Sequence, residues 1–200
     1  MERKGKIIVL SAPSGTGKST IIQRLMEMPE LHLGFSISAT CRAPRGQEQD
    51  GREYYFLTQE TFAAYVRQGR FVEWEEVYPG CRYGTLLSEV ERVTGSGRNL
   101  IMDIDVKGAL SIKRVFGAEA LCIFIEPPSL QELERRLRDR ATDTDEVIAR
   151  RLAKAEYELS FAPRFDAVVV NDSLDQAVSQ ARQLIITLSL IHISEPTRLR

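Results

Sequence analysis

Short apolar runs alternate with amphipathic segments along this chain of 200 residues. The runs are rich in β-branched residues and predict strands buried on both faces: residues 7–10, 100–102, 121–125 and 167–170. Segments with helical spacing of apolar residues separate them, the first being residues 18–28, which Pro29 ends. Strands that alternate with helices in this way predict an α/β fold of three layers, with helices on both faces of a central parallel sheet.

Two regions interrupt this alternation. Residues 34–88 are aromatic and polar, and their short alternating pieces predict a small insertion that is partly β: residues 35–38, 54–57 and 71–74. Residues 126–163 predict two charged helices with capping-box patterns at their starts, Ser129 with Glu132 and Asp143 with Glu146. The remaining segments, 1–33, 89–125 and 164–187, form the predicted core.

Charge and composition narrow the class of protein. The chain carries 27 Lys and Arg against 28 Asp and Glu, a net charge of −1, which argues against a general nucleic-acid or anionic-membrane binder. No apolar stretch approaches the roughly 18 residues of a membrane span. Three cysteines without a CxxC motif, and an N-terminus unlike a signal peptide, favour the cytoplasm. The two histidines are far apart, so a zinc site or a Ser-His-Asp hydrolase is not expected.

The loop at residues 12–19 carries the strongest chemical signal. It follows a predicted strand, opens a predicted helix and ends in Gly-Lys-Ser, as phosphate-binding loops do, with Ala12 where the general pattern has its first glycine. Its backbone N–H groups are expected to cradle phosphates, with Lys18 neutralising their charge and the Ser19 hydroxyl ligating Mg²⁺. The residues expected to bind the triphosphate are Ala12, Pro13, Ser14, Gly15, Thr16, Gly17, Lys18, Ser19 and Thr20. The loop alone does not identify the reaction.

Two arginines in the insertion form a second candidate phosphate site. Arg42 and Arg45 are three residues apart, so they can grip one phosphate together, and Tyr54 can add a hydroxyl. The alternative is a pair of surface arginines whose acidic partners are Asp50 and Glu53. These residues alone favour neither interpretation.

Several motifs in fixed order resemble the guanylate kinase family of P-loop nucleoside monophosphate kinases. Besides the phosphate loop, they are Ser-x-Ser-x-Thr-x-Arg-x-Pro-Arg at 36–45, Gly-x-x-Tyr-x-Phe at 51–56, and short matches at 71–74, 83–85, 103–105 and 170–172. The resemblance covers about residues 5–187. It implies transfer of the γ-phosphoryl group of ATP to GMP with Mg²⁺, an acceptor-binding region at 34–88 and a closing lid at 126–163. Cys41 departs from the threonine of many members, and one extra residue precedes Tyr83.

The resemblance assigns acceptor contacts to eight residues. Those matching guanine-binding positions are Ser38, Glu73, Thr85 and Asp103, and those matching positions that hold the GMP phosphate are Arg42, Arg45, Tyr54 and Tyr83. The chemistry of Glu73 agrees, because a carboxylate accepts from guanine N1–H and the exocyclic amine together, a donor pair that adenine lacks. Discrimination of this kind is worth roughly 10⁴-fold. Without the resemblance, the sequence favours the interpretation of Glu73 as a half-exposed strand residue beside Trp74.

The lid and the metal side complete the expected site. Arg140 and Arg151 match the family's lid arginines, and with Lys18 and Arg45 they form the expected catalytic set. An arginine of this kind is worth roughly 10³–10⁵ in rate in related P-loop enzymes. Because a phosphate acceptor already carries an anionic oxygen, the chemistry needs no general base.

Four polar residues follow predicted strands at the edge of the sheet where α/β proteins bind ligands. Asp103 or Asp105 is expected to orient Mg²⁺ through water, although Asp105 is equally suited to cap the helix that follows. Asn171 and Asp172 match the family's contact with adenine, the alternative being a turn and helix cap.

Two further interpretations stay open. The alternatives to a kinase for GMP are a kinase for another phosphorylated acceptor, such as a ribose bisphosphate, and a non-catalytic binding module related to guanylate kinase. Residues 188–198 resemble the translation of a sequencing adapter, so residues 188–200 are not expected to belong to the native protein. The sequence does not indicate an oligomeric state.

Overall fold

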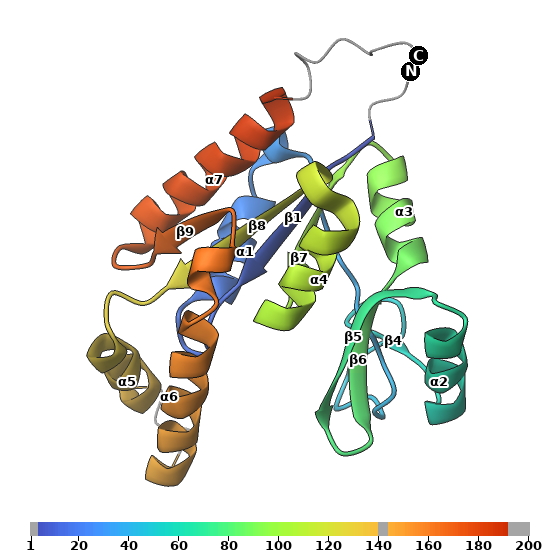
Figure 1. Cartoon of the computed structure of the whole chain (residues 1–200), viewed down its shortest axis with the longest axis horizontal. Coiled ribbons are helices and arrows are strands. Elements are labelled where there is room, and N and C mark those ends of the chain that lie inside the picture. Colours follow the sequence, from blue (N-terminus) through green and yellow to red (C-terminus); the bar gives the residue numbers. More distant parts are fainter. Residues whose placement is uncertain (1–3, 140–143, 192–200) are drawn as a thin grey trace.

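The computed structural model describes residues 4–139 and 144–191 (Figure 1). Its core is a five-stranded sheet in which every neighbouring pair is parallel. In spatial order the strands are β2 (Leu33–Phe35), β7 (Asn99–Asp103), β1 (Ile7–Ser11), β8 (Ala120–Glu126) and β9 (Ala167–Val170). Four of them contain the runs predicted from the sequence, so the α/β class and the parallel sheet are confirmed.

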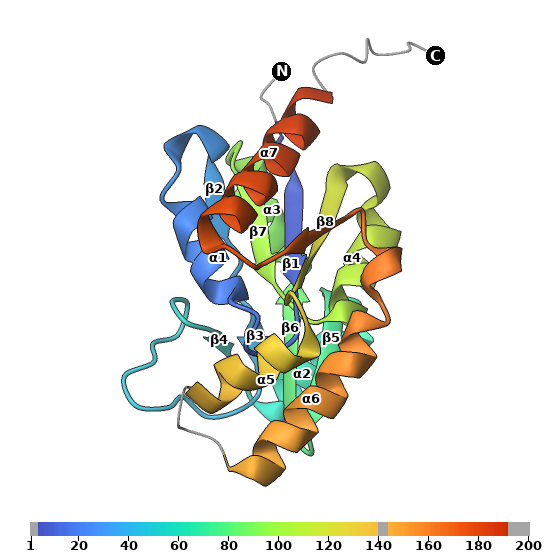
Figure 2. The same cartoon turned by 90° about the vertical axis from the view of Figure 1, so that its left-hand side faces the viewer.

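Helices cover both faces of this sheet, because alternate residues of each central strand point to opposite sides. In β1, Ile8 and Leu10 belong to the apolar cluster of α1 (Lys18–Met26) and α7 (Leu174–Ile191). Ile7 and Val9 belong instead to the cluster of α3 (Leu87–Gly95) and α4 (Val106–Phe116). The two helix pairs therefore flank the sheet, which confirms the three layers (Figures 1 and 2).

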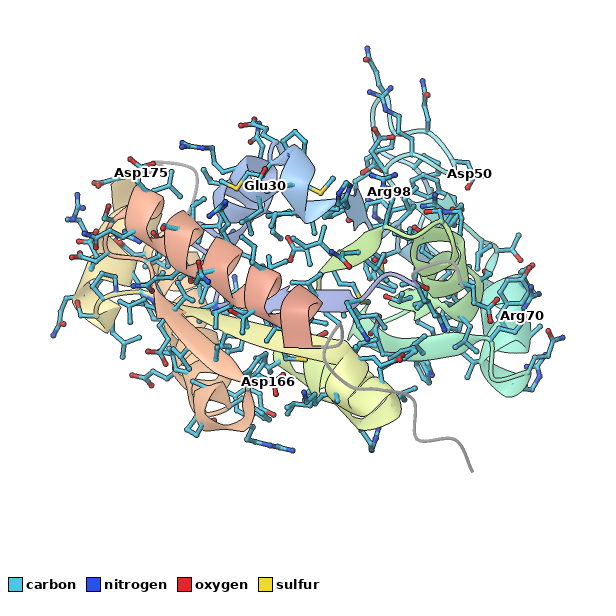
Figure 3. All side chains as sticks on the ribbon, turned by 90° about the horizontal axis from the view of Figure 1, so that it is seen from above. Glu30, Asp50, Arg70, Arg98, Asp166 and Asp175 are labelled. Carbon is cyan, nitrogen blue, oxygen red and sulfur yellow. The ribbon has the colours of Figure 1, made fainter. Side chains whose placement is uncertain are left out.

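Two ion pairs lie on the surface of the layer formed by α1 and α7. Arg24 of α1 pairs with Asp175 at 3.3 Å, and Arg182 of α7 pairs with Glu30 at 3.0 Å. Glu30 lies in a short 3₁₀ helix, Pro29–Leu31; two others span Gly117–Glu119 and Ala162–Arg164. Glu30 and Asp175 lie on the same side of α7 (Figure 3). These side chains are exposed, so each pair adds little to stability.

The insertion forms a second sheet with its own helix. Its strands, in spatial order, are β4 (Tyr55–Phe56), β3 (Ala39–Thr40), β6 (Cys81–Leu86) and β5 (Phe71–Tyr78). The accompanying helix is α2 (Gln59–Arg67), whose buried Phe62 stacks on Phe71 with ring centroids 4.4 Å apart. The partly β character expected for this region is therefore confirmed.

The alternating piece expected at residues 35–38 is not one strand. Phe35 ends β2 in the core sheet, and β3 begins at Ala39 in the small sheet, so residues 36–38 cross between the two. Ser36 N–H still donates to Ile101 O of the core sheet and Ser38 O accepts from Tyr55 N–H of the small sheet, while between them Ile37 N–H donates to the Glu89 carboxylate at 2.8 Å. Alternation in the sequence does not register such a crossing, because these contacts come from distant segments.

The two charged helices are α5 (Leu130–Asp139) and α6 (Asp145–Leu159), which pack through Leu133, Leu137, Ile148 and Ala155. The Ser129 hydroxyl accepts from Glu132 N–H at 3.1 Å, as the capping pattern predicts. Asp143, the other expected cap, lies outside the described residues. In Figure 1 the α5–α6 pair lies below the core on one side and the small sheet below it on the other. Among the described residues, no helix is long and apolar enough to cross a membrane.

Candidate active site

The phosphate loop joins β1 to α1 in a conformation that its glycines permit. Gly15 and Gly17 have φ of 95° and 91°, values that residues with a Cβ rarely adopt. The buried Thr16 hydroxyl donates to Pro13 O at 2.5 Å and closes a turn inside the loop. Helix α1 begins immediately afterwards at Lys18. The loop therefore ends at a helix N-terminus, where backbone N–H groups favour an anion.

All the loop residues assigned to the triphosphate line one cavity of about 370 Å³. Its remaining lining residues are Asp103, Ile104, Asp105, Arg151, Lys154 and Glu158. The Lys18 ammonium forms an ion pair with Asp103 at the end of β7. Lys18 is thus held inside the cavity, at the carboxyl ends of the parallel strands.

One of the expected lid arginines reaches this cavity. Arg151 of α6 donates from Nη1 to the Ser14 hydroxyl at 2.9 Å, which joins the helix pair to the phosphate loop. Arg140 lies outside the described residues. The structure therefore places one of the two expected lid arginines, Arg151, beside the loop.

A second cavity of about 230 Å³ lies between the core and the small sheet. Five of the residues assigned to the acceptor line it, namely Ser38, Tyr54, Glu73, Tyr83 and Asp103. Asp103, Ile104 and Asp105 line both cavities. The two cavities therefore meet at the carboxyl end of β7, an arrangement suited to holding two ligands end to end.

Glu73 is fixed by a buried hydroxyl. Thr85 Oγ1 donates to Glu73 Oε1 at 2.7 Å, and Thr85 is fully buried. Gly108 of α4 leaves the room that Glu73 needs, since a Cβ there would lie 3.1 Å from Glu73 Oε2. Burial raises the pKa of the Glu73 carboxyl, the Asp105 charge adds to this, and the Thr85 hydrogen bond opposes it. A ligand that donates to Glu73 would compensate its loss of hydration.

Arg42 does not line the second cavity itself, but it contacts two residues that do, Tyr54 and Tyr83. Its Nε donates to the Tyr83 hydroxyl at 3.0 Å, and its guanidinium lies 4.9 Å from the centre of the Tyr54 ring. Its acidic partner is Glu48, which it contacts through two hydrogen bonds of 2.7 and 2.8 Å. Arg45 has an exposed side chain, and its backbone N–H donates to Glu48 at 2.7 Å.

The acidic residues considered as partners of the arginines have other roles. Asp50 accepts from the backbone N–H of Phe56 at 2.8 Å, and Glu53 accepts from that of Gln49 at 2.7 Å. Asp50 therefore closes the loop that precedes β4. The alternative of Arg42 paired with Asp50 or Glu53 is wrong, because the folded loop brings Glu48 to Arg42 instead.

Asp105 caps α4, as the alternative interpretation proposed. Its Oδ1 accepts from the backbone N–H groups of Lys107 at 2.7 Å and Gly108 at 3.0 Å. The side chains of Asp105 and Glu75 also hydrogen-bond to each other. This bond, then burial and the Asp105 charge, raises the pKa of Glu75 to about 7. Burial favours a higher pKa for Asp105 too, but the hydrogen bonds outweigh it and lower that pKa.

The oxygen atoms lining the first cavity fit the chemistry of magnesium. Within the described residues, no three His, Cys, Asp or Glu side chains group closely enough to hold a metal ion by themselves. Mg²⁺ in phosphate-transfer sites commonly takes one or two protein oxygens, with water and substrate phosphates as its other ligands. Ser19 and Asp105 line the phosphate-loop cavity and offer such oxygens.

Asn171, which follows β9, hydrogen-bonds to the backbone of the phosphate loop. Its side-chain Nδ2 donates to Thr16 O at 2.6 Å, and both residues are buried. Its carbonyl oxygen accepts from Arg136 of α5 at 3.0 Å. Asp172 is exposed next to it. The expected contact of Asn171 and Asp172 with a nucleotide base stays a prediction.

Sequence reasoning missed several acidic and basic residues of the site. Glu48 accepts hydrogen bonds from Arg42, and Glu75 is hydrogen-bonded to Asp105. The buried Glu158 forms an ion pair with Lys154 at 3.5 Å. Only Glu75 carried a signal, its alternation with Glu73 along a strand. The others lie in charged stretches that resemble solvated surface.

Comparisons with known proteins agree with this geometry. A family model described as guanylate kinase matches residues 4–188. The guanylate kinase of Porphyromonas gingivalis is 56% identical over 180 residues, 90% of this chain and 96% of that protein. The guanylate kinase of Bacteroides fragilis is 51% identical over 182 residues, 91% of this chain and 89% of that protein. The crystal structure of guanylate kinase from Anaplasma phagocytophilum has a TM-score of 0.72 at 29% identity, over 95% of this chain and 89% of that one. The chain therefore belongs to the guanylate kinase family.

Proposed function

We propose that the chain transfers the γ-phosphoryl group of ATP to GMP, giving ADP and GDP in purine nucleotide metabolism. The observation that carries this proposal is the meeting of the two cavities at Asp103, Ile104 and Asp105. One cavity contains a phosphate loop and the other a buried carboxylate with an arginine beyond it. A donor triphosphate and an acceptor monophosphate bound there would bring their phosphates together, and this placement supplies much of the catalysis of phosphoryl transfer.

On the acceptor side, Glu73 accepts from the N1–H and exocyclic amine of guanine, with Thr85 holding its carboxylate from behind. Ser38 and Asp103 complete the base site. Arg42, Arg45, Tyr54 and Tyr83 hold the GMP phosphate. Adenine offers no matching donor pair, so it would leave the side of the Glu73 carboxylate that faces the cavity without a donor, which favours guanine.

On the donor side, the loop N–H groups and Lys18 hold the β- and γ-phosphates of ATP, while Asn171 and Asp172 lie on the adenine side. Arg151 reaches the same cavity from α6 and neutralises charge on the transferring group, together with Arg140 and Arg45. When bound, Mg²⁺ supplies further neutralisation of the phosphates, held by Ser19 and, partly through water, by Asp105. The acceptor oxygen is already anionic, so no side chain has to remove a proton.

In this proposal residues 34–88 bind the acceptor, residues 126–163 form the lid, and the remaining core binds ATP. Helix α6 carries Arg151 and the buried Glu158, which both line the phosphate-loop cavity, and this supports its assignment to the lid. We place the reaction in the cytoplasm, a reducing compartment in keeping with three unpaired cysteines, Cys41, Cys81 and Cys122.

A coupled assay of ADP release tests the proposal, with GMP compared with AMP, dTMP and UMP as acceptors. We expect a strong preference for GMP, and equal rates with all four would overturn the proposal. Glu73→Gln should reduce kcat/KM for GMP about a hundredfold, because the amide loses the charge and turns an NH2 donor toward one of the two guanine donors. Glu76→Gln is the matched control on the same strand, since Glu76 is exposed and contacts Arg82 instead.

A further inference from the structure

Glu48 is a charged residue that the proposed mechanism leaves without a role. Its Oε1 and Oε2 accept from Nη2 and Nη1 of Arg42 at 2.8 and 2.7 Å. Its Oε2 also accepts from the backbone N–H of Arg45 at 2.7 Å, and its own N–H donates to Arg45 O at 3.1 Å. One carboxylate therefore holds the side chain of one arginine and the backbone of the other.

The contact with Glu48 uses only one edge of the Arg42 guanidinium. Glu48 takes the Nη1–Nη2 edge, and Nη1 also donates to Ala43 O at 2.9 Å. The Nε on the other edge donates to the Tyr83 hydroxyl, and Tyr83 lines the acceptor cavity. Arginine has five N–H donors, so an oxyanion can accept from the second N–H of Nη2 and from the Tyr83 O–H, while Nε–H stays on the Tyr83 oxygen and a carboxylate holds the other edge.

The surroundings of Arg42 strengthen this orientation. Its side chain is only 9% exposed and that of Glu48 is 22% exposed. The ring of Tyr54 lies 4.9 Å and that of Phe56 5.6 Å from the guanidinium. The hydrogen bonds from Arg42, and then that from the Arg45 backbone, lower the pKa of Glu48 to about 2, so the carboxylate is charged at neutral pH. Arg42 is thus fixed by a charged partner and by two aromatic rings.

We propose that Glu48 is a positioning residue for the acceptor phosphate. It keeps the Nε–Nη2 edge of Arg42 directed to the Tyr83 side of the acceptor cavity, and it sets the turn that presents Arg45. The inference rests on the proposed function, because it takes the monophosphate to bind at Arg42 and Arg45. It extends that function by assigning a role to a residue that does not touch the substrate.

Glu48→Gln tests this inference, since glutamine keeps the size of the side chain but loses its charge and one acceptor oxygen. We expect KM for GMP to rise about tenfold, the size of one charge-assisted hydrogen bond. KM for ATP should stay unchanged, and so should the Kd for guanosine, which has no phosphate. Glu53→Gln is the matched control, because it removes a charge from the same loop without touching Arg42.

Other outcomes overturn the inference. A lower KM for GMP in Glu48→Gln would mean that Glu48 competes with the phosphate for Arg42. Equal losses of GMP and guanosine binding would mean that Glu48 only maintains the fold of the loop. In an Arg42→Ala background, a further tenfold rise on adding Glu48→Gln would show that Glu48 does not act through Arg42.

The proposed function is judged separately. Wild-type protein that binds GMP and guanosine but does not phosphorylate GMP would overturn the proposed function. Calorimetric Kd values for the two ligands would still decide the role of Glu48.

Discussion

Asn171 donates its side-chain amide to the carbonyl oxygen of Thr16, 155 residues earlier in the chain, at 2.6 Å. The contact ties the end of β9 to the middle of the phosphate loop. It also leaves no space for a side chain at Gly17, where a Cβ would lie 2.6 Å from Asn171 Nδ2. The conformation of the loop therefore depends on a residue that comes near the end of the folded chain.

Replacing Asn171 should weaken the loop and the fold together. Asn171→Ala leaves the Thr16 carbonyl buried without a donor, so we expect the free energy of unfolding to fall by about 1–3 kcal/mol. KM for ATP should rise as well, because the loop is no longer held in place. Asn171→Asp has the same shape but cannot donate, and should be at least as harmful. Urea unfolding and ATP kinetics measure these effects, with the exposed Gln180→Ala of α7 as the control. Unchanged values for Asn171→Ala would contradict this account of the loop.

Lys18 should matter for turnover far more than for stability. Its ion pair with Asp103 places the ammonium in the phosphate-loop cavity, where the proposed function has it neutralise the phosphates of ATP. Lys18→Ala should lower kcat about 10²–10³-fold, the usual loss on removing a group that stabilises charge in the transition state. Lys113→Ala is the control, because Lys113 pairs with Asp166 at 2.7 Å and lines neither cavity. Full turnover by Lys18→Ala would exclude the proposed role.

The core was predictable from the sequence because its determinants are local. The run at 7–10 is apolar at every position, as a strand covered on both faces requires, and Gly15 and Gly17 lie where the loop needs a positive φ. The burial of a strand is visible in its run of apolar residues, and the need for a positive φ is visible in the position of a glycine, so both can be recognised within a few residues of sequence.

The partners of charged side chains were not predictable in the same way. Glu48, Asp50 and Glu53 all lie within reach of Arg42 along the chain, and the sequence does not rank them. The turn at Gly46, with φ of 56°, and the bond from Arg45 N–H direct Glu48 to Arg42. The contact of Glu75 with Asp105 likewise arises only when β5 of the small sheet meets α4 of the core.

The buried carboxylate of Glu73 should reduce stability in the absence of GMP. Burial raises its pKa, so around its ordinary pKa of 4.5 the folded protein holds a proton that the unfolded chain releases. The free energy of unfolding therefore falls as pH rises through this range. Glu73→Gln removes the charge, so it should be more stable than wild type at pH 8 and close to it at pH 4. Urea unfolding at both pH values measures the difference. If Glu73→Gln were less stable than wild type at pH 8, burial of the charged Glu73 carboxylate would not destabilise the fold.

The bond between Glu75 and Asp105 should give the ligand-free protein a dependence on pH near neutrality. The pKa of Glu75 is about 7 in the folded protein against an ordinary 4.5, so stability present below pH 4.5 is lost as pH rises through 7. Because Glu75 is partly exposed, we expect a loss of only about 1 kcal/mol between pH 5 and pH 8.

Glu75→Gln isolates this contribution, because its amide donates to Asp105 at every pH. The fall in stability between pH 5 and pH 8 should be smaller in this variant than in wild type, as urea unfolding at the two pH values will measure. Glu76→Gln should retain the wild-type fall, since contacts with Gly80 and Arg82 lower the pKa of Glu76 and keep it charged throughout this range. If Glu75→Gln also retained that fall, the proton released between pH 5 and pH 8 would belong to a group other than Glu75. Glu158, whose pKa burial raises, would then be the next residue to replace.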